Sequence, residues 1–144
     1  MISQTAEYAL RAMVYLADQN GAPQTTQQIA KVTLVPAGYL AKVMQGLSRA
    51  GLVHAQRGLH GGFTLATPPD QLTVLDVVQA VDPLQRIEHC PLGLKGHQSL
   101  CPLHRRLDNA VAMVEKALGA STIAELLAEP KRGKGPKPLC SLLD

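Results

Sequence analysis

Two cysteines and three histidines are close neighbours in the sequence between positions 89 and 104. They are His89, Cys90, His97, Cys101 and His104. Thiolates and imidazoles are common protein ligands of zinc and of iron–sulfur clusters. Cys101 and His104 are three residues apart at the expected start of a helix, so both side chains can face one site, and a helix N-terminus lowers the pKa of a thiol. This block therefore predicts a metal-binding or redox-sensing site.

The number of cysteines indicates the cellular compartment. The chain has three, and the third, Cys140, lies in the tail and is expected to be incidental. An odd count, without the basic region and apolar run of a secretion signal, argues against a disulfide framework. No segment approaches the length needed to span a bilayer. We therefore expect a cytoplasmic protein without membrane contact, whose cysteines are free thiols, metal ligands or redox sensors.

The Cys/His block belongs to a long irregular segment that precedes a strong helical pattern. Residues 82–100 show neither a helical nor a strand period, and loops of this length are uncommon unless they are functional. Apolar residues then recur on one stripe from Pro102 to Leu118, which predicts a helix. Thr122 and Glu125 have the spacing of a capping box for a short helix, Ile123–Ala128.

A chain of 144 residues with 46% hydrophobic but only 3% aromatic residues has a limited interior of its own, and such chains often complete it by dimerising. We therefore expect a sensing loop at 83–101 and dimerisation helices at 102–129. The tail at 130–144 is basic and rich in proline and glycine, and we expect it to be poorly ordered.

The first 82 residues show the order of elements of a winged helix-turn-helix. Helical spacing of apolar residues, capping residues and Gly-rich turns mark three helices, a hairpin and a fourth helix. The expected fold is mainly α with a small β-hairpin wing, followed by the long dimerisation helix. The expected helices are 3–19, 25–31, 36–50 (with Pro36 at the first helical position) and 74–80, and the expected strands are 52–55 and 63–66.

Charge in this segment is one-sided. From Gln19 to Pro69 there is no Asp or Glu, and the basic residues in the same stretch are Lys31, Lys42, Arg49 and Arg57. A basic face without acids suits DNA, because each neutralised phosphate releases counterions. Charge alone does not separate such a face from an ordinary solvated one.

Three groups of residues are candidates for DNA contacts. Polar residues at the start of the second helix suit a phosphate, exposed residues near the start of the third helix can reach base edges, and the basic hairpin tip can enter the minor groove. The alternatives are that Tyr39 packs against the second helix and that His60 is an ordinary loop residue. The candidates are Thr26, Gln27, Gln28, Gly38, Tyr39, Lys42, Arg57 and His60.

Five segments, in order and with matching spacing, resemble the regulator family of IscR, NsrR and CymR. They are Tyr8–Met13, Gly38–Lys42, Ala50–Val53, Arg57–Phe63 and Val77–Asp82. The resemblance covers roughly residues 1–128, and several ordered matches are far more specific than a lone helix-turn-helix pattern. It implies a homodimer, held by the long helix near the C-terminus, that reads a palindromic operator in double-stranded DNA.

One position departs from that family. Ala41 stands where some iron–sulfur members carry an acidic residue that tunes site choice. The operator preference of those members therefore does not transfer to this chain.

The resemblance also implies a ligand set. Cys90 and Cys101 resemble the first and last of three loop cysteines in cluster-binding relatives, and the middle cysteine is missing. His104 resembles a ligand histidine, and Glu7 falls where other relatives use an acidic residue of the partner subunit. The implied set is Cys90, Cys101, His104 and Glu7, with His97 as a substitute. Two cysteines with nitrogen or oxygen ligands suit a [2Fe–2S] cluster better than a [4Fe–4S] cluster, and the alternatives are zinc and no metal.

Two other functional classes fit the sequence less well. A zinc-dependent enzyme is a distant alternative, because no second group of acids and bases and no phosphate-binding glycine loop accompany the Cys/His block. A zinc-structured interaction module would need no basic wing, and Arg57 argues against it. The sequence therefore predicts a regulator that is not an enzyme.

Overall fold

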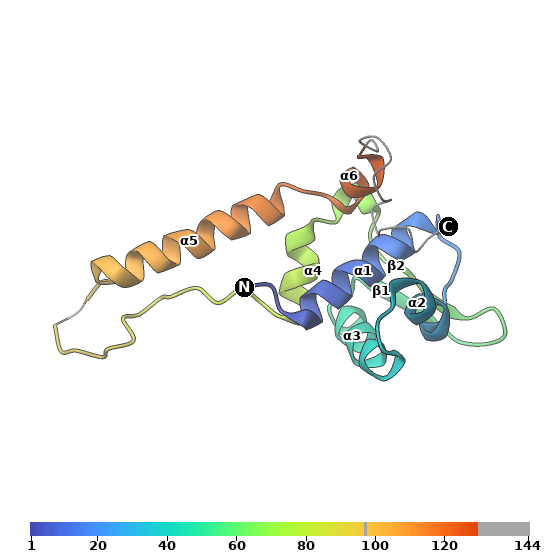
Figure 1. The fold of residues 1–144 in the computed structure, drawn as a ribbon, viewed down its shortest axis with the longest axis horizontal. Coiled ribbons are helices and arrows are strands. Elements are labelled where there is room, and N and C mark those ends of the chain that lie inside the picture. Colours follow the sequence, from blue (N-terminus) through green and yellow to red (C-terminus); the bar gives the residue numbers. More distant parts are fainter. Residues whose placement is uncertain (97, 130–144) are drawn as a thin grey trace.

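A computed structural model describes residues 1–96 and 98–129. The expected substitute ligand His97, the tail 130–144 and Cys140 lie outside the described residues. The elements occur in the expected order of a winged helix-turn-helix followed by a long helix (Figure 1). They are α1 (Gln4–Asp18), α2 (Thr26–Thr33), α3 (Ala37–Arg49), β1 (Val53–Gln56), β2 (Gly62–Leu65), the 3₁₀ helix η1 (Pro69–Gln71), α4 (Val74–Val81), α5 (Pro102–Gly119) and α6 (Ile123–Ala128).

Local capping chemistry explains where most of the helices begin. A Ser or Thr hydroxyl accepts a hydrogen bond from the backbone N–H three residues later, which satisfies one of the free donors of the first turn. In α2, α4 and α6 the residue at that position answers with its own side chain. This confirms the capping boxes expected for α2 and α6, and α4 has one as well. The pairs are Ser3 with Ala6, Thr25 with Gln28, Thr73 with Asp76, and Thr122 with Glu125.

The start of α3 differs by one residue from the expectation. Pro36 precedes the helix and is not its first residue, because its ψ of 128° is extended rather than helical. The C-terminal end agrees with the prediction, since Gly51 follows the helix with a φ of +75°, a left-handed conformation that glycine adopts without strain.

Small residues on α1 allow four helices to pack closely around it. Ala9, Ala12 and Met13 are fully buried, and α1 contacts α2, α3, α4 and α6. The other helices contribute aliphatic side chains to the same cluster, as expected for a chain with few aromatic residues. These side chains are Ile29, Leu40, Val43, Met44, Leu47, Val77 and Ile123.

The wing is a two-stranded antiparallel hairpin that is joined to the helical body. Val53 pairs with Leu65 and Gln56 with Gly62, so β1 begins one residue after, and β2 one residue before, the positions expected from sequence. The backbones of Gln24 and Phe63 exchange two hydrogen bonds, at 3.1 and 2.7 Å. The buried Gln24 also accepts a hydrogen bond from the Tyr15 hydroxyl at 2.7 Å, which ties the wing to α1.

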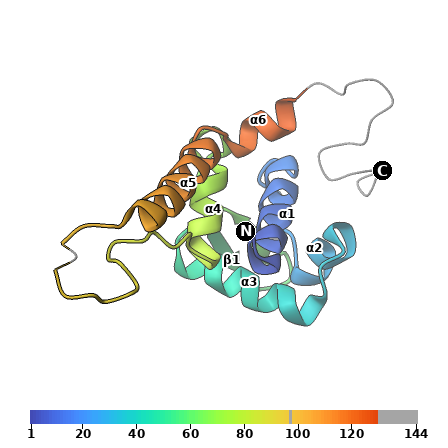
Figure 2. The ribbon, with the colours of Figure 1, turned by 60° about the vertical axis from the view of Figure 1, so that its left-hand side comes forward.

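The two helices after the loop have different surroundings. α5 has no buried residue and projects away from the body, and the loop residues 83–96 run beside it (Figure 1). α4 lies between α5 and α1 (Figure 2). α6 instead returns to the winged domain, where Ile123 is fully buried and its N–H donates to the Leu72 carbonyl at 2.8 Å. No helix among the described residues is long and apolar enough to cross a membrane.

Candidate functional site

The structure brings Cys90, Cys101 and His104 together into one half-buried Cys/His site. Their ligand atoms all lie within 4.8 Å of one another. The His104 Nδ1 is 3.0 Å from the Cys101 Sγ and 3.8 Å from the Cys90 Sγ. The sulfur and nitrogen ligands of one tetrahedral metal ion are about 3.5 to 3.8 Å apart. The residues present therefore fit a metal in donor chemistry, and their spacing is close to that of ligands on a single ion.

Two of the three residues are positioned by the start of α5. Cys101 is the N-cap residue, Pro102 opens the helix, and His104 lies in its first turn. The backbone N–H of His104, followed by its imidazole, lowers the pKa of the Cys101 thiol to about 7. The helix start thus favours a thiolate, which is the form that binds metals and reacts with oxidants.

Cys90 reaches the site because an ion pair fastens the loop to α5. The Arg86 guanidinium donates two hydrogen bonds to Asp108, at 2.7 and 2.8 Å, and one to Glu115 at 3.1 Å. Asp108 also accepts the Ile87 N–H at 2.8 Å. The Arg86 guanidinium, and then the Ile87 N–H, lower the pKa of Asp108 to about 2. A bidentate arginine–carboxylate pair sets orientation as well as distance, so this contact aligns the loop with the helix that carries Cys101.

Glu7, the expected fourth ligand, does not join the site within one chain. It lies on α1, where its carboxylate accepts a hydrogen bond from the Arg11 Nε at 2.9 Å. Arg11 also donates to the Thr33 carbonyl at the end of α2 and lies over the Tyr8 ring. A ligand role for Glu7 therefore requires a second copy of the chain.

The candidates at the start of α2 differ in their availability. Gln27 is exposed and Thr26 is half-buried. Gln28 is exposed, but its side-chain oxygen accepts the Thr25 N–H at 2.8 Å as part of the capping box. The local cap thus occupies one of the polar groups that the sequence offered for a phosphate.

On α3, Gly38 and Lys42 are exposed and Tyr39 is held by α1. The Tyr39 ring packs edge-on against Tyr8, with the ring centroids 5.4 Å apart, and its hydroxyl hydrogen-bonds the Thr5 hydroxyl. The partners of Tyr39 that the structure shows are therefore on α1, a helix that the sequence-based alternative did not name.

The wing tip presents its side chains to solvent. Arg57, Leu59 and His60 are all exposed, and Leu59 is 95% exposed. Gly58, with a φ of +107°, and the bond from the Gly61 N–H to the Gly58 carbonyl at 3.0 Å close the turn. Lys31, Lys42, Arg49 and Arg57 form no salt bridge among the described residues.

Sequence reasoning did not select Arg49 as a functional residue. It lies on the same face of α3 as Lys42, and both side chains line one recess. The signal was present, because residues seven apart are two helical turns apart and share a face.

Comparisons with known proteins agree with one another. The model of the Rrf2 family, described as an iron-dependent transcriptional regulator, matches residues 2–129. A protein of Aquifex aeolicus (strain VF5) that is named as an HTH-type transcriptional regulator is 32% identical over 131 residues, covering 88% of this chain and 91% of that protein.

Solved structures of regulators share the fold. CymR, the global cysteine regulator of B. subtilis, superposes with a TM-score of 0.72 at 28% identity, over 89% of this chain and 96% of CymR. IscR of T. potens superposes with a TM-score of 0.75 at 23% identity, over 93% of this chain and 90% of that one.

Proposed function

The chain belongs to the Rrf2 family of transcriptional regulators, and on this premise we propose that it is a homodimer that binds a palindromic operator and changes its DNA affinity with the state of the Cys/His site. The observation that carries this proposal is the convergence of Cys90, Cys101 and His104 at the start of α5. The site lies where the loop from the winged domain meets α5, the helix that we propose forms the dimer. A change in its metal content or oxidation state can therefore alter how these two parts are arranged.

Exposed groups on three elements support the DNA-binding role. α3 is the second helix of the helix-turn-helix, and such helices enter the major groove with their N-terminal residues at base edges. Unpaired cations near this face and at the wing tip favour phosphate and minor-groove contacts. We assign the contacts to Thr26, Gln27, Gln28, Gly38, Tyr39, Lys42, Arg57 and His60.

The exposed apolar face of α5 supports dimerisation. Leu103 and Leu107, one helical turn apart, are 62% and 48% exposed, and neighbouring large apolar side chains on a monomer surface mark an interaction site. A second α5 covers this face in the proposed dimer. Leu107→Glu should then yield a monomer in light scattering, whereas Asn109→Glu, which adds the same charge at another exposed position of α5, should remain a dimer.

We assign a [2Fe–2S] cluster to the Cys/His site, with Glu7 of the second copy or His97 completing the ligand set. Such a cluster supplies a one-electron redox centre when bound. Cys90, Cys101 and His104 would hold it, and the Arg86–Asp108 pair orients the loop. Zinc is the second candidate, because three donors within 4.8 Å suit a single ion.

The position of the site suggests how it controls DNA binding. If ligands come from both copies, they set the angle between the two α3 helices, and their loss shifts a pre-existing equilibrium between DNA-competent and incompetent dimers. In addition, Glu7 is paired with Arg11, which contacts the end of α2, so a change at Glu7 is linked to the helix-turn-helix.

The test is an absorbance spectrum of protein purified without oxygen, with iron, zinc and sulfide assayed on the same sample. Visible bands with matching iron and sulfide support the cluster, whereas stoichiometric zinc without sulfide supports the second candidate. Cys90→Ser with Cys101→Ser should abolish either metal, and Cys140→Ser is the matched control that should retain it. A protein that stays metal-free after reconstitution, or a double variant with unchanged operator affinity and redox response, refutes metal-dependent control.

A further inference from the structure

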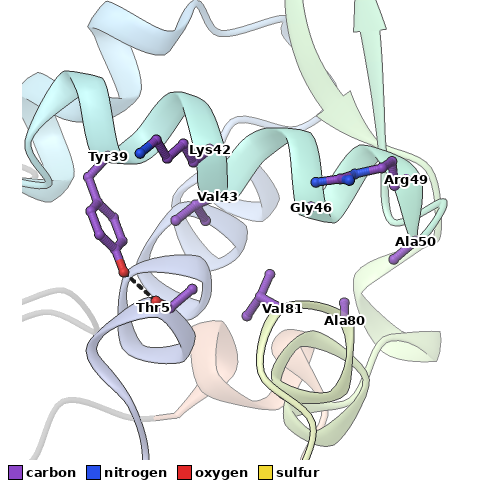
Figure 3. A pocket seen from close by; sticks show the side chains of 9 residues that line it. All are labelled: Thr5, Tyr39, Lys42, Val43, Gly46, Arg49, Ala50, Ala80 and Val81. Atoms are coloured by element: carbon purple, nitrogen blue, oxygen red, sulfur yellow. Dashed lines mark hydrogen bonds between the residues drawn. The ribbon is translucent and has the colours of Figure 1, made fainter.

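A recess separate from the Cys/His site lies beside α3. The N-terminal part of α1, α3 and the C-terminal end of α4 enclose it, with a volume of about 640 Å³ (Figure 3). Small-molecule sites in proteins occupy roughly 300 to 1,000 Å³. The recess is therefore large enough for a ligand, and neither the metal chemistry nor the wing uses it.

Two cations lie on the α3 side of the recess. Lys42 and Arg49 are two turns apart on α3, with Gly46 between them, and Figure 3 shows the Arg49 side chain running back toward Gly46. Neither cation forms a salt bridge or a hydrogen bond with another described residue. An anion placed here would meet two unpaired cations, and the guanidinium can bind a carboxylate or a phosphate through two N–H groups.

The apolar lining of the recess comes from two helices. Val43 lies on α3, and Ala80 and Val81 lie at the end of α4. A Cβ added at Gly46 would lie 3.5 Å from the Val81 Cγ1, so a larger side chain at this position enters the recess. The absence of a side chain at Gly46 therefore lets α3 and the end of α4 approach closely beside the recess.

Hydroxyl groups close one end. The Tyr39 hydroxyl pairs with Thr5, and Figure 3 shows this pair at the end nearest Lys42. The Tyr39 ring is held edge-on by Tyr8. The wall is therefore formed before any ligand arrives, which lowers the entropic cost of binding.

We propose that this recess binds a small organic acid, a carboxylate or phosphate head on an apolar body. The head lies between Lys42 and Arg49, and the body lies against Val43 and Val81. The binding of this acid goes beyond the proposed function. Its effect on DNA binding rests on that function, because the ligand engages Lys42, a candidate DNA contact, and so weakens DNA binding. A backbone phosphate of DNA offers the same anion without the apolar body, and the test separates the two sources.

The experiment is calorimetric titration of the full-length protein with octanoate, acetate, inorganic phosphate and octanol. Each methylene buried against the apolar wall strengthens binding about fourfold. We therefore expect octanoate to bind at least about tenfold more tightly than acetate. Octanol, which lacks the charge, should also bind at least about tenfold more weakly than octanoate.

Variants on one helix provide matched controls. Gly46→Leu fills the recess, whereas Ala41→Leu adds the same side chain at an exposed position of α3 that does not line it. We expect octanoate binding to fall at least about tenfold in Gly46→Leu and to persist in Ala41→Leu. Arg49→Met should weaken octanoate binding similarly, and because Arg49 is exposed this variant keeps the test valid if Gly46→Leu does not fold.

Three outcomes overturn the proposal: no saturable binding of octanoate to the wild type, equal octanoate binding by Gly46→Leu and Ala41→Leu, or phosphate binding as tight as octanoate binding, which makes the recess a site for DNA phosphate.

Salt-dependent retention on duplex DNA is measured with and without octanoate. Octanoate should lower retention of the wild type and leave that of Gly46→Leu unchanged. If octanoate binds and retention stays the same, the regulatory consequence is wrong. If the wild-type protein is not retained on DNA even without octanoate, the proposed function is refuted and the binding site is not.

Discussion

Replacement of Gly62 by alanine is expected to detach the wing from the helical body. Gly62 has a φ of +146°, and a Cβ built on it would lie 2.7 to 2.8 Å from the backbone N, C and O atoms of Gln24. The Gln24 backbone cannot retreat without losing the two hydrogen bonds that it exchanges with Phe63. Gly62 is therefore required by both its own conformation and the close approach of another backbone.

The magnitude follows from these two costs. A non-glycine residue in a left-handed conformation costs about 1 to 2 kcal/mol. Each of the two hydrogen bonds contributes about 0.5 to 1.5 kcal/mol to stability. Gly62→Ala should therefore lower the free energy of unfolding by about 3 kcal/mol.

Gly58→Ala is the matched control, because it separates conformation from contact. Gly58 lies in the same hairpin with a φ of +107°, and nothing lies within 4 Å of a Cβ built on it. It should therefore lose only the conformational part, about 1 to 2 kcal/mol. Urea unfolding followed by far-UV circular dichroism measures both variants.

The DNA-binding readout uses the same pair. Retention on DNA should fall more in Gly62→Ala than in Gly58→Ala, because the whole wing loses its orientation. Unrelated surface substitutions typically differ by about 0.5 kcal/mol. If the unfolding free energies of the two variants differ by no more than this, the close approach of the Gln24 backbone does not require glycine at position 62.

Three further predictions concern the loop and the core. Arg86→Met should raise the pKa of Asp108 from about 2 toward its ordinary value in a carbon-detected NMR titration, and an unchanged midpoint would contradict the pairing. Because this pKa is depressed in the folded state, the pair stabilises the loop above about pH 4 and loses this effect as the pH falls toward 2. In metal-free protein, the rate of Cys101 alkylation plotted against pH should have a midpoint near pH 7. His104→Ala should raise this midpoint only partly, because the backbone N–H that contributes most to the lowered pKa is retained. A midpoint that the variant does not change would exclude the imidazole as a cause. Tyr15→Phe leaves a buried amide oxygen without its donor and should cost about 1 to 3 kcal/mol in urea unfolding, and a neutral result would mean that water replaces the hydroxyl.

Elements that depend on neighbouring residues could be predicted from the sequence. Thr25 with Gln28 and Thr122 with Glu125 form capping boxes within four residues, so their spacing alone determined where α2 and α6 begin. Similarly, Cys101 and His104 were recognisable as a pair because one helical turn joins them. The predicted strand bounds and the predicted start of α3 at Pro36 each differ from the structure by one residue, because hairpin register and helix entry depend on contacts beyond the local pattern.

Contacts between distant segments required the tertiary structure. The sequence offered Cys90 as a ligand by resemblance, but it is the Arg86–Asp108 pair, 22 residues apart, that aligns its loop with α5. For Tyr39 the sequence left open a base contact or packing on the second helix, and packing against Tyr8 on α1 decided the partner.

The sequence by itself therefore determined the kinds and order of the elements, the basic stretch and the Cys/His chemistry, because these depend on residue types and short spacings. Only the tertiary structure decided that α6 packs into the winged domain while α5 stays exposed, and that Lys42, Arg49 and Val81 line one recess. The physical reason is that these features depend on which distant side chains fill the space around α1 and α3, and no local pattern carries that information.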